Sequence, residues 1–107
     1  MEKSFFAADL LAEIPVPDKG MVSRTLQNDE HSKIILFGFA AGGGLRDHSA
    51  PMPVMLYFLK GEATLTMGDD TRTVGPGAFT HMQPGLIHAI EARTAVLMLL
   101  VLIKCAP

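Results

Sequence analysis

Histidine is the residue type in this sequence best suited to chemistry near neutral pH, because an imidazole can move a proton, bind a polar group or ligate a metal. The chain has four histidines. His31 lies in the polar stretch 29–32, where we expect it to be solvated. His48, His81 and His88 lie near glycines, prolines and apolar residues, and they are the candidates for one shared site.

Short strands are expected to position these histidines. Most of the chain consists of short apolar segments separated by glycine and proline, which is typical of an all-β sandwich or barrel. In segment 62–67, Ala63, Leu65 and Met67 alternate with polar residues, as in a strand with one buried face. Before the strands, residues 4–13 can form one short helix. The expected strands are 21–26, 33–40, 54–59, 62–67, 72–74, 78–82, 87–92 and 95–103.

The last strand differs from the others because segment 96–103 is apolar at every position. A strand with one face in water would alternate between apolar and polar residues. Both faces of this strand should therefore be covered, one by the barrel core and the other by a second sheet or a second subunit. In so short a chain, a homodimer explains the pattern at least as well as a monomeric sandwich.

Size and composition indicate one globular domain. The chain has 107 residues, of which 49% are hydrophobic and 19% are charged, so it can form one buried core. We expect a single domain over 1–107, with an N-terminal helix or arm over 1–20 and a barrel over 21–104. The net charge of -2 and the scattered Lys and Arg residues argue against a nucleic-acid partner.

The sequence predicts a cytoplasmic protein without membrane contact. The longest apolar run, 95–103, is far shorter than the about 20 residues that cross a bilayer. The first residues lack the charged start, apolar stretch and cleavage site of a signal peptide. Cys105 is the only cysteine, so it cannot form an internal disulfide, and we assign it no catalytic role.

The glycines and histidines of the C-terminal two thirds of the chain resemble the two motifs of the cupin family. The matching positions are Gly42, His48 and Gly61 in the first motif, and Gly77, Gly85 and His88 in the second. The run 48–51, His-Ser-Ala-Pro, is most similar to that of the small single-domain, RmlC-like cupins. This resemblance implies a double-stranded β-helix, or jelly-roll, barrel with a site in its mouth.

The resemblance also implies a metal site, but the ligand set is incomplete. Cupins with the complete motifs hold a metal through three His and one Glu, and here Ala50 and Val54 stand at two of those four positions. His48 and His88 stand at the other two. His81 would be a third nitrogen ligand if it points inward, and otherwise a partly buried histidine without this role. The metals that suit such a site are Zn, Ni, Cu, Fe or Mn, and the alternative is that none binds.

Other chemical groups are poorly placed for the same site. An oxygenase site with two His and one carboxylate needs an inward-facing acid. Asp47 is adjacent to His48 and should face the other way, and Glu62 and Glu91 belong to neither motif. Tyr57 is out of phase with His48, which argues against a His/Tyr acid–base pair of the sugar-epimerase type.

Three functional hypotheses follow. The first is a small-molecule-binding cupin, with or without a divalent metal in the barrel mouth. The second is a metal-dependent enzyme, such as a dioxygenase or an isomerase, although no residue is assigned a catalytic role. The third is a structural or accessory dimer without pocket chemistry. The expected pocket is lined by His48, His81, His88, Met52, Met55, Leu56, Phe58, Phe79 and Ile90.

Overall fold

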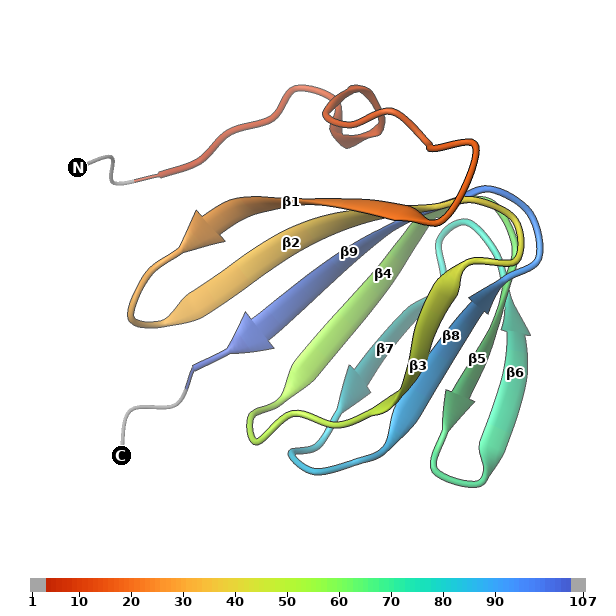
Figure 1. The fold of residues 1–107 in the computed structure, drawn as a ribbon. Coiled ribbons are helices and arrows are strands. Elements are labelled where there is room, and N and C mark those ends of the chain that lie inside the picture. The colour runs from red at the N-terminus through yellow and green to blue at the C-terminus, as the bar shows by residue number, and fades with distance from the viewer. Residues whose placement is uncertain (1–3, 105–107) are drawn as a thin grey trace.

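The computed structural model describes residues 4–104, which form nine β-strands and one turn of 3-10 helix (Figure 1). The strands are β1 (Met21–Asn28), β2 (Ser32–Phe39), β3 (Gly44–His48), β4 (Val54–Lys60), β5 (Ala63–Met67), β6 (Asp70–Val74), β7 (Phe79–Met82), β8 (His88–Ala92) and β9 (Val96–Ile103). Cys105 lies outside the described residues. Within residues 4–104, no helix is long and apolar enough to cross a membrane.

The strands form two antiparallel sheets. One has five strands in the order β1-β2-β9-β4-β7, and the other has four in the order β3-β8-β5-β6. Residues from both sheets pack into one apolar cluster, so the sheets face each other around a shared core. The predicted all-β jelly-roll barrel is confirmed.

The N-terminal helix is shorter than the predicted segment 4–13. Only Leu10–Ala12 forms the helix η1, and the side chain of Asp9 caps it by accepting a hydrogen bond from the backbone N–H of Leu11 at 3.1 Å. None of the three helical residues is buried, and the side chain of Phe6 is 84% exposed. Only Leu10 packs partly against apolar side chains, and a short helix that buries so little is marginally stable in water, which explains why only one turn forms.

Alternate residues of each sheet point into the core. In the five-stranded sheet, Leu56 and Phe58 of β4 and Met98 of β9 are at most 1% exposed. In the four-stranded sheet, Leu65 and Ile90 are at most 3% exposed. This period of two is the side-chain pattern of a strand, and it determines which residues can reach the interior of the barrel.

The N-terminal segment covers part of the outer face of the five-stranded sheet, above β1 and β2 in Figure 1. Ile14 packs in a second buried cluster with Leu36 of β2 and Leu97 of β9. The segment runs close to the strand, because a Cβ atom added to Gly38 would lie 3.3 Å from the carbonyl oxygen of Pro15. The chain's own N-terminal segment therefore provides part of the cover that the apolar sequence of β9 predicts.

The rest of this outer face stays open to solvent. Met55 is the cross-strand neighbour of Val101, and Tyr57 is the neighbour of both Leu99 and Phe79. The side chain of Tyr57 is 40% exposed and that of Phe79 is 61% exposed. We call this set the outer apolar patch; its residues are Met55, Tyr57, Phe79, Leu99 and Val101.

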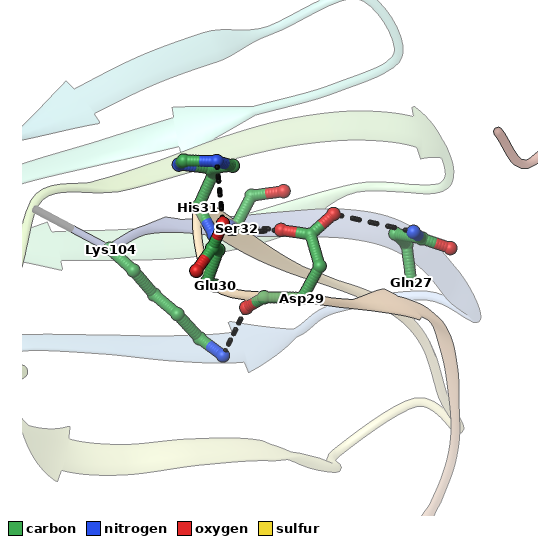
Figure 2. Close-up of polar contacts among 6 residues, drawn as sticks. All are labelled: Gln27, Asp29, Glu30, His31, Ser32 and Lys104. Carbon is green, nitrogen blue, oxygen red and sulfur yellow. Dashed lines mark hydrogen bonds and ion pairs between the residues drawn. The ribbon is translucent and has the colours of Figure 1, made fainter. Parts of the chain in front are cut away.

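The β1–β2 hairpin is tied to the end of β9 by a group of polar contacts (Figure 2). Oδ1 of Asp29 accepts hydrogen bonds from the backbone N–H groups of His31 at 2.8 Å and Ser32 at 2.9 Å. These bonds lower the pKa of the Asp29 carboxyl group. The Nζ atom of Lys104 donates to Oδ1 of Asn28 at 2.6 Å and to the carbonyl oxygen of Asp29 at 2.7 Å.

Candidate functional site

A bulge in β3 brings His48 onto the inner face of the four-stranded sheet. Leu45 pairs with Ile90, and His48 pairs with His88, so three steps along β3 oppose two steps along β8. The extra residue places both Leu45 and His48 on the inner side, and the two residues between them are exposed. The sequence analysis did not predict β3, because two glycines precede it and a third, Gly44, is its first residue.

His48 and His88 form a close pair at the end of the barrel where β3 ends and β8 begins. Their ring centroids are 4.2 Å apart, and the ring planes are inclined by 58°. Nδ1 of His48 lies 2.8 Å from the carbonyl oxygen of Arg46, and Nδ1 of His88 lies 2.9 Å from that of Leu86. Within the described residues, His88 is the only buried polar or charged side chain, with 2% of its surface exposed.

These contacts determine the proton positions on both rings. A carbonyl oxygen can only accept a hydrogen bond, so Nδ1 must carry the hydrogen in His48 and in His88. In the neutral form of each ring, Nε2 then keeps a free lone pair. Neither Nε2 has a hydrogen-bond partner among residues 4–104, and since no buried side-chain nitrogen there lacks a partner, both Nε2 atoms are open to solvent. The pair therefore presents two nitrogen acceptors that a ligand or a metal can use.

Burial keeps His88 neutral. Desolvation is the main cause that lowers the pKa of His88, and the nearby His48 lowers it further. The hydrogen bond to the carbonyl of Leu86 acts in the opposite direction but does not reverse the shift. At neutral pH the His88 ring is thus an acceptor at Nε2 rather than a cation.

Two further residues near the pair were missed in the sequence analysis as site residues. Met67 of β5 is the cross-strand neighbour of His88. Thr80 of β7, in the opposite sheet, places Oγ1 3.2 Å from the Sδ atom of Met67. The alternation of Ala63, Leu65 and Met67 already indicated that Met67 faces inward, so the sequence contained the signal for this residue.

The structure divides the apolar residues of the predicted pocket between several locations. Leu56, Phe58 and Ile90 lie in the main core. Met52 is not part of this core but lies in the loop between β3 and β4, where it lines a surface hollow. The other residues lining the hollow are Pro51, Pro53, Gln83, Pro84 and Lys104.

The prediction that Met55, Phe79 and His81 line the interior is wrong. Met55 alternates with the buried Val54 and Leu56 along β4, so it faces outward. Its cross-strand neighbour in β7 is His81, which is exposed, as is Phe79 two positions earlier. His81 therefore lies on the outer face of the five-stranded sheet and cannot be a third ligand beside His48 and His88.

The four-ligand metal site of complete cupin motifs does not fit this chain. Val54 is 3% exposed and packs in the core, and Ala50 packs against it, so neither position offers a donor atom. Within residues 4–104, no three side chains of His, Cys, Asp or Glu are grouped closely enough to hold a metal ion. What the chain retains is a pair of imidazoles.

A groove of about 890 Å³ lies apart from this pair. Its lining includes Thr64, Thr66 and Glu91, which alternate with the inward-facing residues of β5 and β8. It is therefore on the outer face of the four-stranded sheet, with the histidines on the opposite side. We assign the candidate site to His48 and His88, because among residues 4–104 only there does a buried titratable side chain meet another from a separate strand.

Comparison with solved structures supports one family. The chain is 32% identical to a conserved protein of unknown function from Streptococcus pyogenes, with a TM-score of 0.87, covering 100% of this chain and 93% of that one. A cupin superfamily protein from Desulfitobacterium hafniense is 24% identical, with a TM-score of 0.82 and coverage of 86% and 84%. KdgF from Halomonas sp. is 16% identical, with a TM-score of 0.80 and coverage of 96% of each chain. At these lower identities the likeness shows the fold alone.

The family model agrees with the structural comparison. No curated protein matches the chain. The model described as a cupin domain matches residues 35–103, which include both candidate histidines, the whole four-stranded sheet and the five-stranded sheet without β1 and the start of β2. The chain therefore belongs to the cupin family.

Proposed function

We propose that this cupin binds a small molecule at the end of the barrel where His48 and His88 meet, with the two rings as its polar anchor. The observation that carries the proposal is the arrangement of the pair: two rings 4.2 Å apart, each with Nδ1 bonded to a backbone carbonyl. A few convergent polar groups among apolar side chains are the usual composition of a small-molecule site.

A ligand that donates hydrogen bonds suits this pair better than a carboxylate does at neutral pH. The lowered pKa of His88 keeps its ring neutral, so Nε2 accepts hydrogen bonds. A hydroxyl group can donate to such an atom, whereas an ionised carboxylate has no proton to donate. Carboxylate binding would require a protonated ring, and it should therefore strengthen as the pH falls.

A metal ion is the second candidate occupant. Histidines that ligate metals usually donate their other ring N–H to a carbonyl or carboxylate, and both rings here do so. Because the chain supplies only two nitrogen ligands from His48 and His88, a divalent metal would take its other ligands from water or from a bound small molecule.

Nitrogen NMR of the imidazole rings tests the proposal. The probes are neutral alcohols (glycerol, propanediol and cyclohexanol) and two carboxylates (acetate and benzoate). We expect the alcohols to shift the Nε2 resonances of His48 and His88 at neutral pH more than the carboxylates do. In the His88→Ala variant the shift of the remaining His48 ring should disappear, since the paired anchor is then lost.

His81→Ala is the matched control, because it removes an exposed histidine of the same chain. This variant should keep the response of the wild-type protein. If no probe affects either ring, or if the response is unchanged in His88→Ala, the proposed site is wrong. Zinc titration of the same three proteins tests the metal candidate, and equal zinc binding by wild type and His88→Ala would exclude the pair as its ligands.

We also propose that a second copy of the chain covers the outer apolar patch. The patch contains no Asp, Glu, Lys or Arg side chain, so two copies would bring no like charges together. A patch that joins exposed aromatic residues to partly buried aliphatic ones is typical of an interface, and most small oligomers are symmetric dimers.

Sedimentation analysis tests this interface. The wild-type chain should sediment as a dimer at micromolar concentration, and Phe79→Asp should shift it to a monomer. Thr73→Asp, at an exposed position on the other sheet, should leave the dimer intact. A wild-type monomer at these concentrations would contradict the proposal.

A further inference from the structure

Three potential metal ligands lie in one row across the inner face of the four-stranded sheet. His48 of β3 pairs with His88 of β8, and His88 pairs on its other side with Met67 of β5. Side chains directly opposite each other on neighbouring antiparallel strands have Cβ atoms about 4.5–5.5 Å apart. Two imidazoles and one thioether are therefore adjacent on the same face, at the same level of the barrel.

The sulfur of Met67 is held inside the barrel. Oγ1 of Thr80, from the opposite sheet, donates a hydrogen bond to Sδ of Met67 at 3.2 Å. Met67 also packs against the main core. A thioether sulfur has two lone pairs, so the contact with Thr80 uses one and leaves the other free. Thr80 is thus a positioning residue for this sulfur.

We infer that Nε2 of His48, Nε2 of His88 and Sδ of Met67 form a three-coordinate site for a monovalent copper ion. The inference rests on the proposed function, since it uses the same two histidines. It identifies the metal class and adds a ligand of a type that the complete cupin motifs do not contain.

The chemistry of the three donors favours monovalent copper over divalent metals. A soft thioether ligand selects Cu(I), whereas imidazole alone also suits zinc, nickel and iron. All three donors are neutral, and no carboxylate is grouped with the two histidines within the described residues. Burying a charge without a counter-charge is costly, and the cost is larger for a dication than for a monocation. A neutral site in apolar surroundings should therefore prefer the ion of lower charge.

A competition titration tests the inference. Untagged, full-length protein is titrated with Cu(I) under anaerobic conditions against a chromogenic Cu(I) chelator such as bicinchoninate. We expect one equivalent of bound copper. Met67→Leu, which conserves size and removes the sulfur, should weaken Cu(I) binding by at least about tenfold, since even indirect changes around metal ligands cost that much. The same variant should leave zinc affinity unchanged.

Met55→Leu is the matched control, because Met55 lies on the outer face of the barrel. It should bind Cu(I) as tightly as the wild type. X-ray absorption of the wild-type copper form provides a measurement that does not depend on any variant, and it should show one sulfur and two nitrogen neighbours. A shell of nitrogen and oxygen alone, or equal Cu(I) affinity in Met67→Leu and wild type, would overturn the inference.

The titration separates this inference from the proposed function. If the protein binds no stoichiometric copper while the alcohols still shift the Nε2 resonances of His48 and His88, the copper site is wrong and the small-molecule site stands. If copper binds with the expected ligands while no alcohol affects the rings, the copper site stands and the alcohol-binding role is wrong.

Discussion

His81 and His88 lie seven positions apart, on either side of the loop that joins β7 to β8, yet they occupy opposite environments. His88 points into the barrel, donates to the carbonyl of Leu86 and has a lowered pKa because it is buried. His81 is exposed on the outer face of the other sheet, beside Met55. The same residue type therefore has a candidate role in one region and none in the other. The difference arises because His88 lies on the inner face of its sheet and His81 on the outer face of the other sheet, not because the residue types differ.

The largest effect of this inside–outside contrast should appear in stability. Phe58→Ala removes a ring that is 1% exposed and leaves a cavity, so it should lower the free energy of unfolding by about 3–5 kcal/mol. Phe79→Ala removes a ring that is 61% exposed and should change this free energy by no more than about 0.5 kcal/mol. Urea unfolding at low protein concentration, where association contributes little, measures both. Similar losses for the two variants would contradict the assignment of faces.

The pH dependence of stability should distinguish the two histidines. Because the folded pKa of His88 lies below its ordinary value of 6.5, the unfolded chain takes up this proton first as the pH falls. The contribution of the neutral His88 ring to the free energy of unfolding is fully present above pH 6.5. This contribution is lost as the pH falls from 6.5 toward the lowered pKa of the folded state. We expect His88→Leu to reduce this acid sensitivity of the urea midpoint and His81→Leu to leave it unchanged. Equal sensitivity in wild type and His88→Leu would show that another group is responsible.

The exposed carboxyl group of Asp29 should have a smaller effect on the pH dependence of stability. Hydrogen bonds from the backbone N–H groups of His31 and Ser32 lower the pKa of this carboxyl group. The ionised carboxylate therefore contributes to the free energy of unfolding above the ordinary pKa of 3.8, and this contribution is lost as the pH falls through the folded pKa. Asp29→Asn should remove part of the stability loss in this strongly acidic range. Asp69→Asn, in another exposed turn, is the control. An acid-unfolding profile that both variants share with the wild type would contradict this role.

Residue patterns predicted the fold more completely than the site. The alternation in 62–67 and the unbroken apolar run in 96–103 correspond to β5 and β9, because burial directly determines both patterns. The motif residues His48 and His88 do meet, as the family spacing implied. His81 could not be placed from the sequence, since the loop between β7 and β8 interrupts the alternation between it and His88.

Other parts of the site depend on contacts between distant segments. The proximity of Met67 to His88 comes from the pairing of β5 with β8, and the bond from Thr80 comes from the opposite sheet. No local pattern contains this information. The N-terminal segment is a similar case, because its single helical turn is determined by how little of it is buried against β2 and β9.

The extra residue of β3 has a consequence for comparing related chains. Counting alternate positions forward from the inward-facing Leu45 would assign position 48 to the solvent side, although His48 lies against His88. Deleting one residue between the two would restore strict alternation and keep the imidazole inward, opposite His88, whereas keeping the residue but losing the bulge would turn the imidazole outward. An alignment that opens a one-residue gap here would therefore match histidines that lie on the same inner face, one with the bulge and one without it. The bulge, rather than the number of residues in this segment, thus determines the side on which the histidine lies.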